Sequence, residues 1–197
     1  MSASPGPADQ TFLAAGKIVA ILARAGIDSA LIGAAALAAY GYPRSTEDLD
    51  LATGVEPRRL SEMASDLRRE GFTVEVSEPD ANDPLGGVLR VGAEGIDRIE
   101  IVNFCNPPSG GFPALVDVAL REAIPYEEGT SLRVVTLLHL IVFKLYSGGR
   151  KSKNDVFELL SRNPDLDLDG LRELCRKFRM DRKLEGWLRE LRESGDE

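Results

Sequence analysis

Two aspartates separated by one apolar residue are the first feature of this chain that could carry chemistry. Asp48 and Asp50 alternate with Leu49 and Leu51, and residues 49–53 have the composition of a strand. Residues two apart on a strand point to the same face, so the carboxylates would lie side by side while the leucines enter a core. Like charges at that distance repel, and a divalent cation bound by their oxygens offsets the repulsion. We therefore expect a metal-binding edge, with a solvated turn or a helix cap as the ordinary alternative.

Glu100 is the candidate for a third carboxylate at this edge. Ile99 and Ile101 share one face of the strand predicted at residues 97–104, which turns Glu100 to the other face, as Asp50 is turned between its leucines. If the two strands are neighbours, Glu100 joins the aspartates. Otherwise it is an exposed strand residue paired with a lysine or arginine, and the sequence leaves both interpretations open.

Residues ahead of the aspartates could bind phosphate. Gly33 follows a short predicted strand and opens a helix, so backbone N–H groups could approach an anion there, although a tight turn would use glycine equally well. Arg44 could bind a phosphate through its forked guanidinium, or form an ion pair with Asp48 or Glu47. Thr46 could orient the loop through local hydrogen bonds.

The framework that must position these residues is predicted to be α/β, with an antiparallel middle and a helical end. Apolar spacing predicts helices at residues 11–25, 34–40, 56–69, 136–146, 151–160, 169–177 and 181–191. Strands are predicted at residues 29–32, 49–53, 72–76, 87–91 and 97–104. The polar segment 106–113 is predicted to be a functional loop.

Length and composition bound the domain organisation. A chain of 197 residues with 43% hydrophobic and 28% charged residues fits a globular core with a small helical addition. We expect a disordered tail at residues 1–10, a core at 11–135, and a helical region at 136–197 packed on that core.

Charge and rare residues exclude several classes of function. The net charge of −8 argues against broad electrostatic binding of nucleic acid, although residues 150–153 could form a local basic patch. One histidine, His139, lies in an apolar run and is expected to be structural, and Cys105 and Cys175 have neither zinc-site nor disulfide spacing. With no signal sequence and no apolar run long enough to span a bilayer, we expect a soluble cytoplasmic protein.

Taken together, these residues resemble the nucleotidyltransferase superfamily related to DNA polymerase beta. The shared pattern is Gly33-Ala34, then Asp48-Leu49-Asp50, then a third acid at Glu100. The chain looks most like the prokaryotic abortive-infection and type IV toxin nucleotidyltransferases, over roughly residues 29–160. Two positions depart from the superfamily pattern: Ala34 stands where serine or glycine is usual, and Glu100 where aspartate is usual.

The resemblance to that group rests on two further motifs. The first continues the spacing through Gly41, Arg44 and Thr46. The second is a later segment, Lys144 to Asp155, of the form Lys-Leu-Tyr-Ser-Gly-Gly-x-x-Ser-Lys-x-Asp.

The resemblance implies a nucleotidyltransferase fold, a small mixed sheet flanked by helices with a C-terminal helical bundle. It also implies transfer of a nucleoside monophosphate from a nucleoside triphosphate to RNA, protein or a small molecule. Mg²⁺ or Mn²⁺ would be held by Asp48, Asp50 and Glu100, with Glu100 also a candidate general base, and the backbone of Gly33 and Ala34 would cradle phosphates. A toxin role would add a cognate antitoxin, and tRNA or protein as acceptor.

Two other interpretations compete with the active enzyme. One is a degenerate relative that binds nucleotide or a partner without turnover, which the departures at Ala34 and Glu100 favour. The other is an ordinary α/β protein with a chance Asp-x-Asp. The intact series Arg44-x-Thr46-x-Asp48-x-Asp50 favours the enzyme.

Three lysines near the later motif could contact the nucleotide. Lys144 is the lone charge in an apolar helix, so it either reaches a phosphate or extends to solvent. Lys151 and Lys153 follow a Gly-Gly pair and could bind phosphate or the acceptor. Asp155 stands four residues after Lys151, so an ion pair within the helix is the ordinary alternative.

Overall fold

The computed structural model describes residues 6–45, 48–79, 85–106 and 112–195. Its strands are β1 (Ala30–Leu31), β2 (Asp48–Thr53), β3 (Thr73–Ser77), β4 (Val88–Gly92), β5 (Arg98–Asn103), β6 (Ile124–Pro125) and β7 (Arg133–Val134). Its helices are α1 (Pro7–Arg24), α2 (Gly33–Ala39), α3 (Arg59–Arg69), α4 (Phe112–Glu122), α5 (Leu137–Ser147), α6 (Gly149–Arg162), α7 (Leu168–Lys177) and α8 (Asp181–Gly195). The predicted α/β class is therefore confirmed.

One mixed sheet of seven strands organises the described residues, in the order β3-β4-β5-β2-β1-β7-β6. β2 and β5 are parallel neighbours, and Asp50 lies directly opposite Glu100 in their register. β3, β4 and β5 form the antiparallel part, as predicted. The alternation within β2 and β5 sends Leu49, Leu51 and Ile101 into the core, so the acids are left on the other face.

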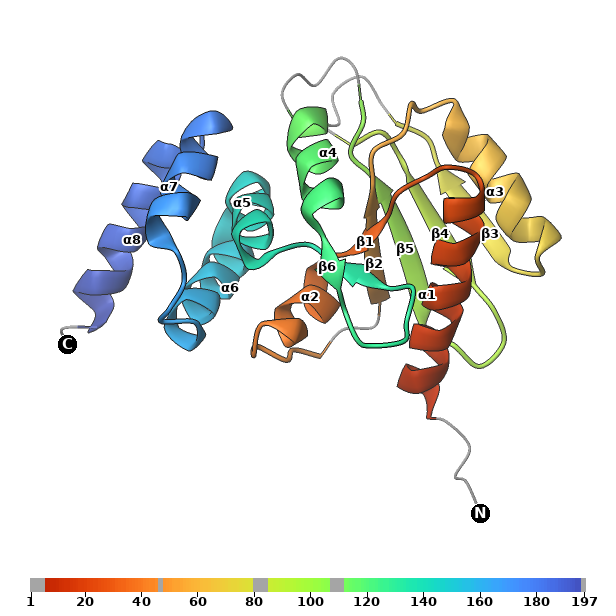
Figure 1. Cartoon of the computed structure of the whole chain (residues 1–197), viewed down its shortest axis with the longest axis horizontal. Coiled ribbons are helices and arrows are strands. Elements are labelled where there is room, and N and C mark those ends of the chain that lie inside the picture. The colour runs from red at the N-terminus through yellow and green to blue at the C-terminus, as the bar shows by residue number, and fades with distance from the viewer. Residues whose placement is uncertain (1–5, 46–47, 80–84, 107–111, 196–197) are drawn as a thin grey trace.

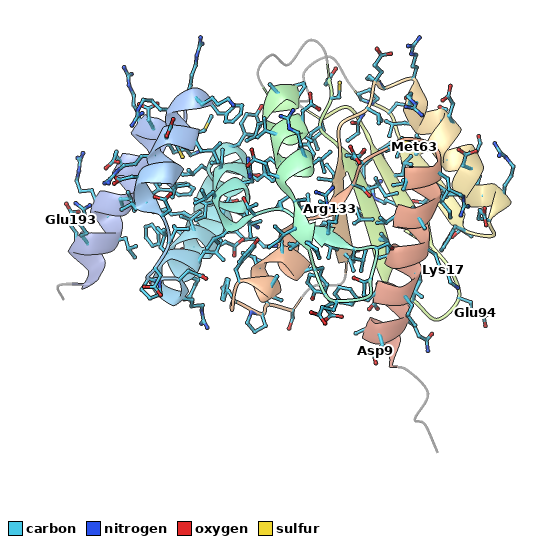
Figure 2. The ribbon with its side chains drawn as sticks, in the orientation of Figure 1. Asp9, Lys17, Met63, Glu94, Arg133 and Glu193 are labelled. Carbon is cyan, nitrogen blue, oxygen red and sulfur yellow. The ribbon has the colours of Figure 1, made fainter. Side chains whose placement is uncertain are left out.

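Helices α1 and α3 cover the core face of the sheet (Figure 1). The apolar side chains of α3 recur at helical spacing, at Leu60, Met63, Ala64 and Leu67, and all four are buried. Figure 2 places Met63 between α3 and the sheet. Helix α1 is tied to the start of β5 because the Thr11 hydroxyl accepts a hydrogen bond from the Asp97 amide at 2.9 Å.

Helices α5 to α8 gather at the end of the molecule away from α1 and α3 (Figure 1). A buried carboxylate joins this group to the sheet domain. Asp155 on α6 accepts from Arg44, which precedes β2, at 3.1 Å, and from Lys144 on α5 at 2.7 Å. The Asp155 side chain is only 2% exposed, so both cations neutralise a charge that would otherwise be costly to bury.

Several boundaries differ from the sequence predictions. Helix α1 begins at Pro7, so residues 7–10 of the predicted tail are helical, and residues 1–5 lie outside the described residues; proline suits a first helical turn, where its missing N–H needs no partner. Helix α4 was not predicted at all, because Pro113 and two β-branched valines obscure its apolar spacing. Strands β6 and β7 are too short to show a period. Residues 107–111 of the predicted functional loop lie outside the described residues.

No helix in the described ranges combines the length and the apolar character that crossing a bilayer requires. Cys105 and Cys175 are free thiols, the first half-buried and the second buried.

We predict that Asp155→Asn destabilises the protein by about 3 kcal/mol, because it leaves Arg44 and Lys144 without the buried carboxylate that neutralises them. Urea denaturation measures the free energy of unfolding. Asp169→Asn is the matched control, since Asp169 is 94% exposed in its ion pair with Arg172 and should change stability by less than about 0.5 kcal/mol. Equal losses for the two variants would contradict the buried-pair account.

Candidate active site

The carboxylate of Asp50 is packed directly against Gly33. Gly33 begins α2 with a φ of +60°, a conformation that residues with a side chain rarely adopt. A Cβ atom built at this position would overlap the Asp50 carboxylate itself. The glycine predicted from the strand-to-helix turn is thus required twice, once for its backbone angle and once for the approach of the acid.

The negative charge of Asp50 lies beside two other acids, and nearby lysines neutralise it only in part. The pKa of Asp50 is raised to about 6, first by burial and then by the charges of Glu100 and Asp48, while the charges of Lys144 and Lys151 oppose the shift. The raised pKa means that the charged form of Asp50 is destabilised. At neutral pH such a carboxylate gains more from a bound cation than a carboxylate already neutralised by a salt bridge. The five residues therefore form one electrostatic unit.

A cavity of about 400 Å³ opens beside Asp50, between the sheet and α5. Its polar residues include Asp50, Lys144 and Ser147, and its apolar wall includes Phe104 and Phe143. The two phenylalanine rings are stacked, with centroids 5.6 Å apart. The sequence did not single out these rings, because their nearness depends on docking α5 against the end of β5. The cavity combines a charged end with a flat aromatic wall.

Glu100 lies opposite Asp50, as the sequence predicted if the two strands were neighbours, and it also forms an ion pair with an arginine. Its Oε1 accepts a hydrogen bond from Arg90 Nε at 2.9 Å. The pairing with an arginine, the alternative left open by the sequence, is therefore present in the structure.

The donor set can be compared with what a divalent metal needs. Within the residues that the structure describes, no three Asp, Glu, His or Cys side chains form a group able to hold a metal ion. Asp48 and Asp50 carry the carboxylate oxygens that Mg²⁺ and Mn²⁺ prefer, and Asp48 Oδ1 forms an ion pair with Arg98 Nε at 3.8 Å. The chemistry of the two aspartates suits a divalent metal ion, and the ligand roles of Asp48, Asp50 and Glu100 all stay predictions.

Two predicted phosphate contacts are placed differently from the expectation. Arg44 binds Asp155, a partner that its neighbours in sequence did not suggest. Ala34 is buried and lines a separate hollow of about 230 Å³ together with Arg44 and Asp48. Thr46 lies outside the described residues.

The three predicted lysines separate in space. Lys144 lines the cavity and forms an ion pair with Asp155, the residue for which the sequence offered Lys151 as the alternative partner. Lys151 is exposed and acts on Asp50 through its charge. Lys153 instead forms an ion pair with Glu190 on α8, away from the cavity. His139 is buried, with Nδ1 2.8 Å from the Thr136 hydroxyl, as expected of a structural residue.

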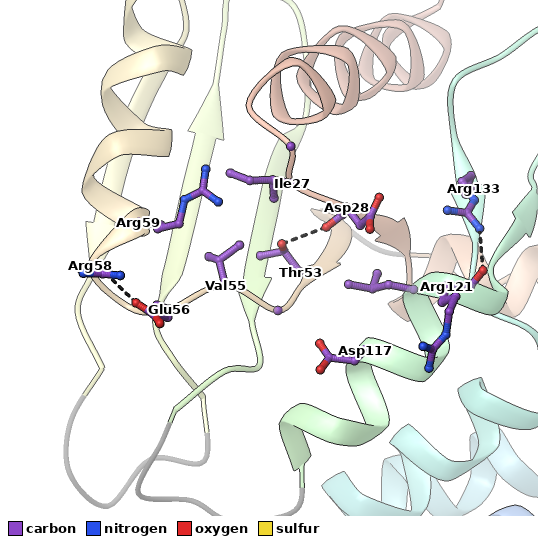
Figure 3. A pocket seen from close by; sticks show the side chains of 13 residues that line it. Ile27, Asp28, Thr53, Val55, Glu56, Arg58, Arg59, Asp117, Arg121 and Arg133 are labelled. Atoms are coloured by element: carbon purple, nitrogen blue, oxygen red, sulfur yellow. Dashed lines mark hydrogen bonds and ion pairs between the residues drawn. The ribbon is translucent and has the colours of Figure 1, made fainter.

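A larger hollow, of about 840 Å³, lies at the far end of β2, beside Thr53 rather than Asp48 (Figure 3). Its arginines are mostly engaged: Arg58 pairs with Glu56, and Arg133 donates to the backbone carbonyls of Arg121 and Ala123. None of the predicted site residues lines it, so size alone does not make it the candidate site.

We predict that Gly33→Ala costs more stability than Gly26→Ala. Both glycines have a positive φ, near +60° and +69°, so both variants incur a backbone cost of about 1 kcal/mol. Nothing lies within 4 Å of a Cβ at Gly26, whereas at Gly33 the Asp50 carboxylate must move, which should add about 1–3 kcal/mol. Urea denaturation of both variants tests this, and equal costs would show that Asp50 does not pack as described.

A second prediction concerns pH. Folding raises the pKa of Asp50 from 3.8 to about 6, so the unfolded chain releases this proton first as pH rises. Stability contributed by the protonated group is complete below about pH 4 and is lost by about pH 6. Asp50→Asn should therefore stabilise the metal-free protein by on the order of 2 kcal/mol at pH 7.5 and by nothing at pH 3.5. Urea denaturation in EDTA at both pH values measures this, and an equal effect at both would refute it.

Comparison with known proteins places the fold. No family model matches the sequence, and no curated protein matches it. An antigenic nucleotidyltransferase-like protein from Paracoccidioides brasiliensis has a similar structure, with a TM-score of 0.55 and 17% identity over 94% of this chain and 95% of that chain.

The protein ANT(2″)-Ia, solved in complex with adenylyl-2″-tobramycin, has a TM-score of 0.50 and 18% identity, over 86% of this chain and 97% of that chain. The solution structure of the same protein, which is described as an antibiotic-resistance factor, has a TM-score of 0.50 and 15% identity, over 92% of this chain and 97% of that chain. The narrower resemblance to abortive-infection proteins stays a prediction. This chain has the fold of the nucleotidyltransferase superfamily.

Proposed function

We propose that this protein is a metal-dependent nucleotidyltransferase that moves a nucleoside monophosphate from a nucleoside triphosphate to an acceptor hydroxyl or amine. The observation that carries the proposal is the cavity of about 400 Å³ that has Asp50, Gly33 and Lys144 in its walls. The cavity brings together a buried carboxylate whose charge is only partly neutralised and a lysine able to bind phosphate. Both lie in a chain with the nucleotidyltransferase fold.

Nucleotide binding would use both ends of this cavity. The Lys144 ammonium, oriented by its 2.7 Å contact with Asp155, would face the triphosphate. The stacked pair of Phe104 and Phe143 offers an apolar surface on which a base could pack. Because Gly33 has no side chain, phosphate oxygens could approach the backbone beside Asp50.

Asp48 and Asp50 would hold Mg²⁺ or Mn²⁺. The bound metal would neutralise triphosphate charge and lower the pKa of the acceptor. The acceptor oxygen or nitrogen forms a bond to the α-phosphorus, the bond to the bridging oxygen breaks, and pyrophosphate leaves. The resemblance proposes Glu100 as the base that receives the acceptor proton.

RNA, protein and small molecules are all proposed as acceptors. The complex of ANT(2″)-Ia with an adenylylated aminoglycoside makes an aminoglycoside one acceptor to include. A toxin role would show as growth arrest on expression, relieved by a cognate antitoxin.

The proposal predicts label transfer from an α-³²P nucleoside triphosphate in the presence of Mg²⁺. Purified protein is incubated with each of the four triphosphates and with tRNA, cell extract or tobramycin. Asp48→Asn/Asp50→Asn should lower transfer at least about a hundredfold, because it removes the ligands that hold the metal.

Asp28→Asn/Asp117→Asn is the matched control, since this double change alters two exposed aspartates in the distant hollow. Full transfer of label by Asp48→Asn/Asp50→Asn would contradict the proposed mechanism. No transfer by the wild type, with Mg²⁺-dependent nucleotide binding retained, would support the degenerate binding protein instead.

A further inference from the structure

A row of charged side chains crosses the sheet at the level of Asp50. The register places Asp50 on β2 opposite Glu100 on β5, and Glu100 opposite Arg90 on β4. Because β5 lies between β4 and β2, Arg90 is on the side of Glu100 away from Asp50. The acid in the middle of the row thus has a like charge on one flank and an opposite charge on the other.

Arg90 is itself held in place. Its Nε donates to Glu100 Oε1 at 2.9 Å, and its Nη1 donates to the Ser77 hydroxyl on β3 at 2.7 Å. The Arg90 side chain is 37% exposed and the Glu100 side chain 22%, so the pair is partly shielded from water. A planar guanidinium bound at two points orients the carboxylate more strictly than a lysine would.

We propose that Arg90, positioned by Ser77, holds Glu100 as a fixed negative charge near the divalent cation. The cation itself would be bound through Asp48 and Asp50, without Glu100 as a ligand. This inference rests on the proposed function and assigns roles within the same site. It makes Arg90 and Ser77 positioning residues and removes Glu100 from the metal ligands.

Two further observations support this assignment. The described residues contain no group of three acidic, histidine or cysteine side chains able to hold a metal ion. Mg²⁺ in nucleotide sites is commonly held by one or two carboxylates, with phosphate oxygens and water completing its shell, so two aspartates are sufficient. Glu100 still acts on Asp50 at a distance, since its charge raises the pKa of that residue.

The test is the affinity for Mn²⁺ alone, measured by the electron paramagnetic resonance signal of the free ion. A charge-balanced double variant, Arg90→Gln/Glu100→Gln, removes one charge of each sign and so leaves the net charge unchanged. We expect its dissociation constant for Mn²⁺ to stay within about threefold of the wild type. Arg90→Gln alone should bind Mn²⁺ at least about threefold more tightly, because it removes a nearby cation and frees a carboxylate. Arg90→Lys should restore the wild-type affinity.

A different set of results would overturn the assignment. If Glu100 is a metal ligand that Arg90 orients, the double variant should lose at least about tenfold in affinity, and Arg90→Gln should also weaken binding. Thermal unfolding of each variant shows whether it is folded, and Ser77→Ala provides a milder change to the same network if Arg90→Gln is not. If the Asp50→Asn variant binds Mn²⁺ as tightly as the wild type, the proposed function itself is overturned, whatever the results for the Glu100 variants.

Discussion

The carboxylate of Asp50 lies where any side chain at position 33 would stand, and the arrangement of the candidate site depends on this contact. It requires glycine at the start of α2, and it requires β2 to present Asp50 toward that helix. The parallel register of β2 and β5 then puts Glu100 next to Asp50. Burial against the helix also removes water from the carboxylate, which is the main reason that its pKa rises to about 6.

Opposite charges are distributed around this acid through two separate ion-pair systems. Asp155 neutralises Arg44 and Lys144, and in doing so it fixes Lys144 in the cavity wall and connects α5 and α6 to the segment before β2. Arg90 neutralises Glu100 from the other direction. The charges of Lys144 and Lys151 act on Asp50 but do not cancel the rise of its pKa. A cation that binds at neutral pH would relieve this imbalance, which is why we infer that the site is built for a metal-bound triphosphate.

Much of this site could be predicted from local patterns, because strand alternation has a period of two residues. That period puts Asp48 and Asp50 on one face of their strand and turns Glu100 away from the core in its own strand, but only the pairing of β2 with β5 brings Glu100 beside Asp50. Partners that lie far apart in the chain could not be found in this way. Asp155 is 111 residues from Arg44, and its pairing depends on how the C-terminal helices dock. The opposition of Arg90 and Glu100 likewise needs the strand order, which no spacing within one strand encodes. The same is true of the stacked Phe104 and Phe143.

The central claim is that the cavity between the sheet and α5 binds a nucleoside triphosphate with a divalent metal. Isothermal titration calorimetry with a triphosphate analogue whose α–β linkage cannot be cleaved tests it without requiring an acceptor. The account predicts saturable binding in Mg²⁺ that weakens at least about tenfold in EDTA, in Asp48→Asn/Asp50→Asn and in Lys144→Met, but not in Lys153→Met, whose lysine faces α8. Binding that is the same with and without Mg²⁺, or that Lys153→Met weakens as much as Lys144→Met, would contradict it.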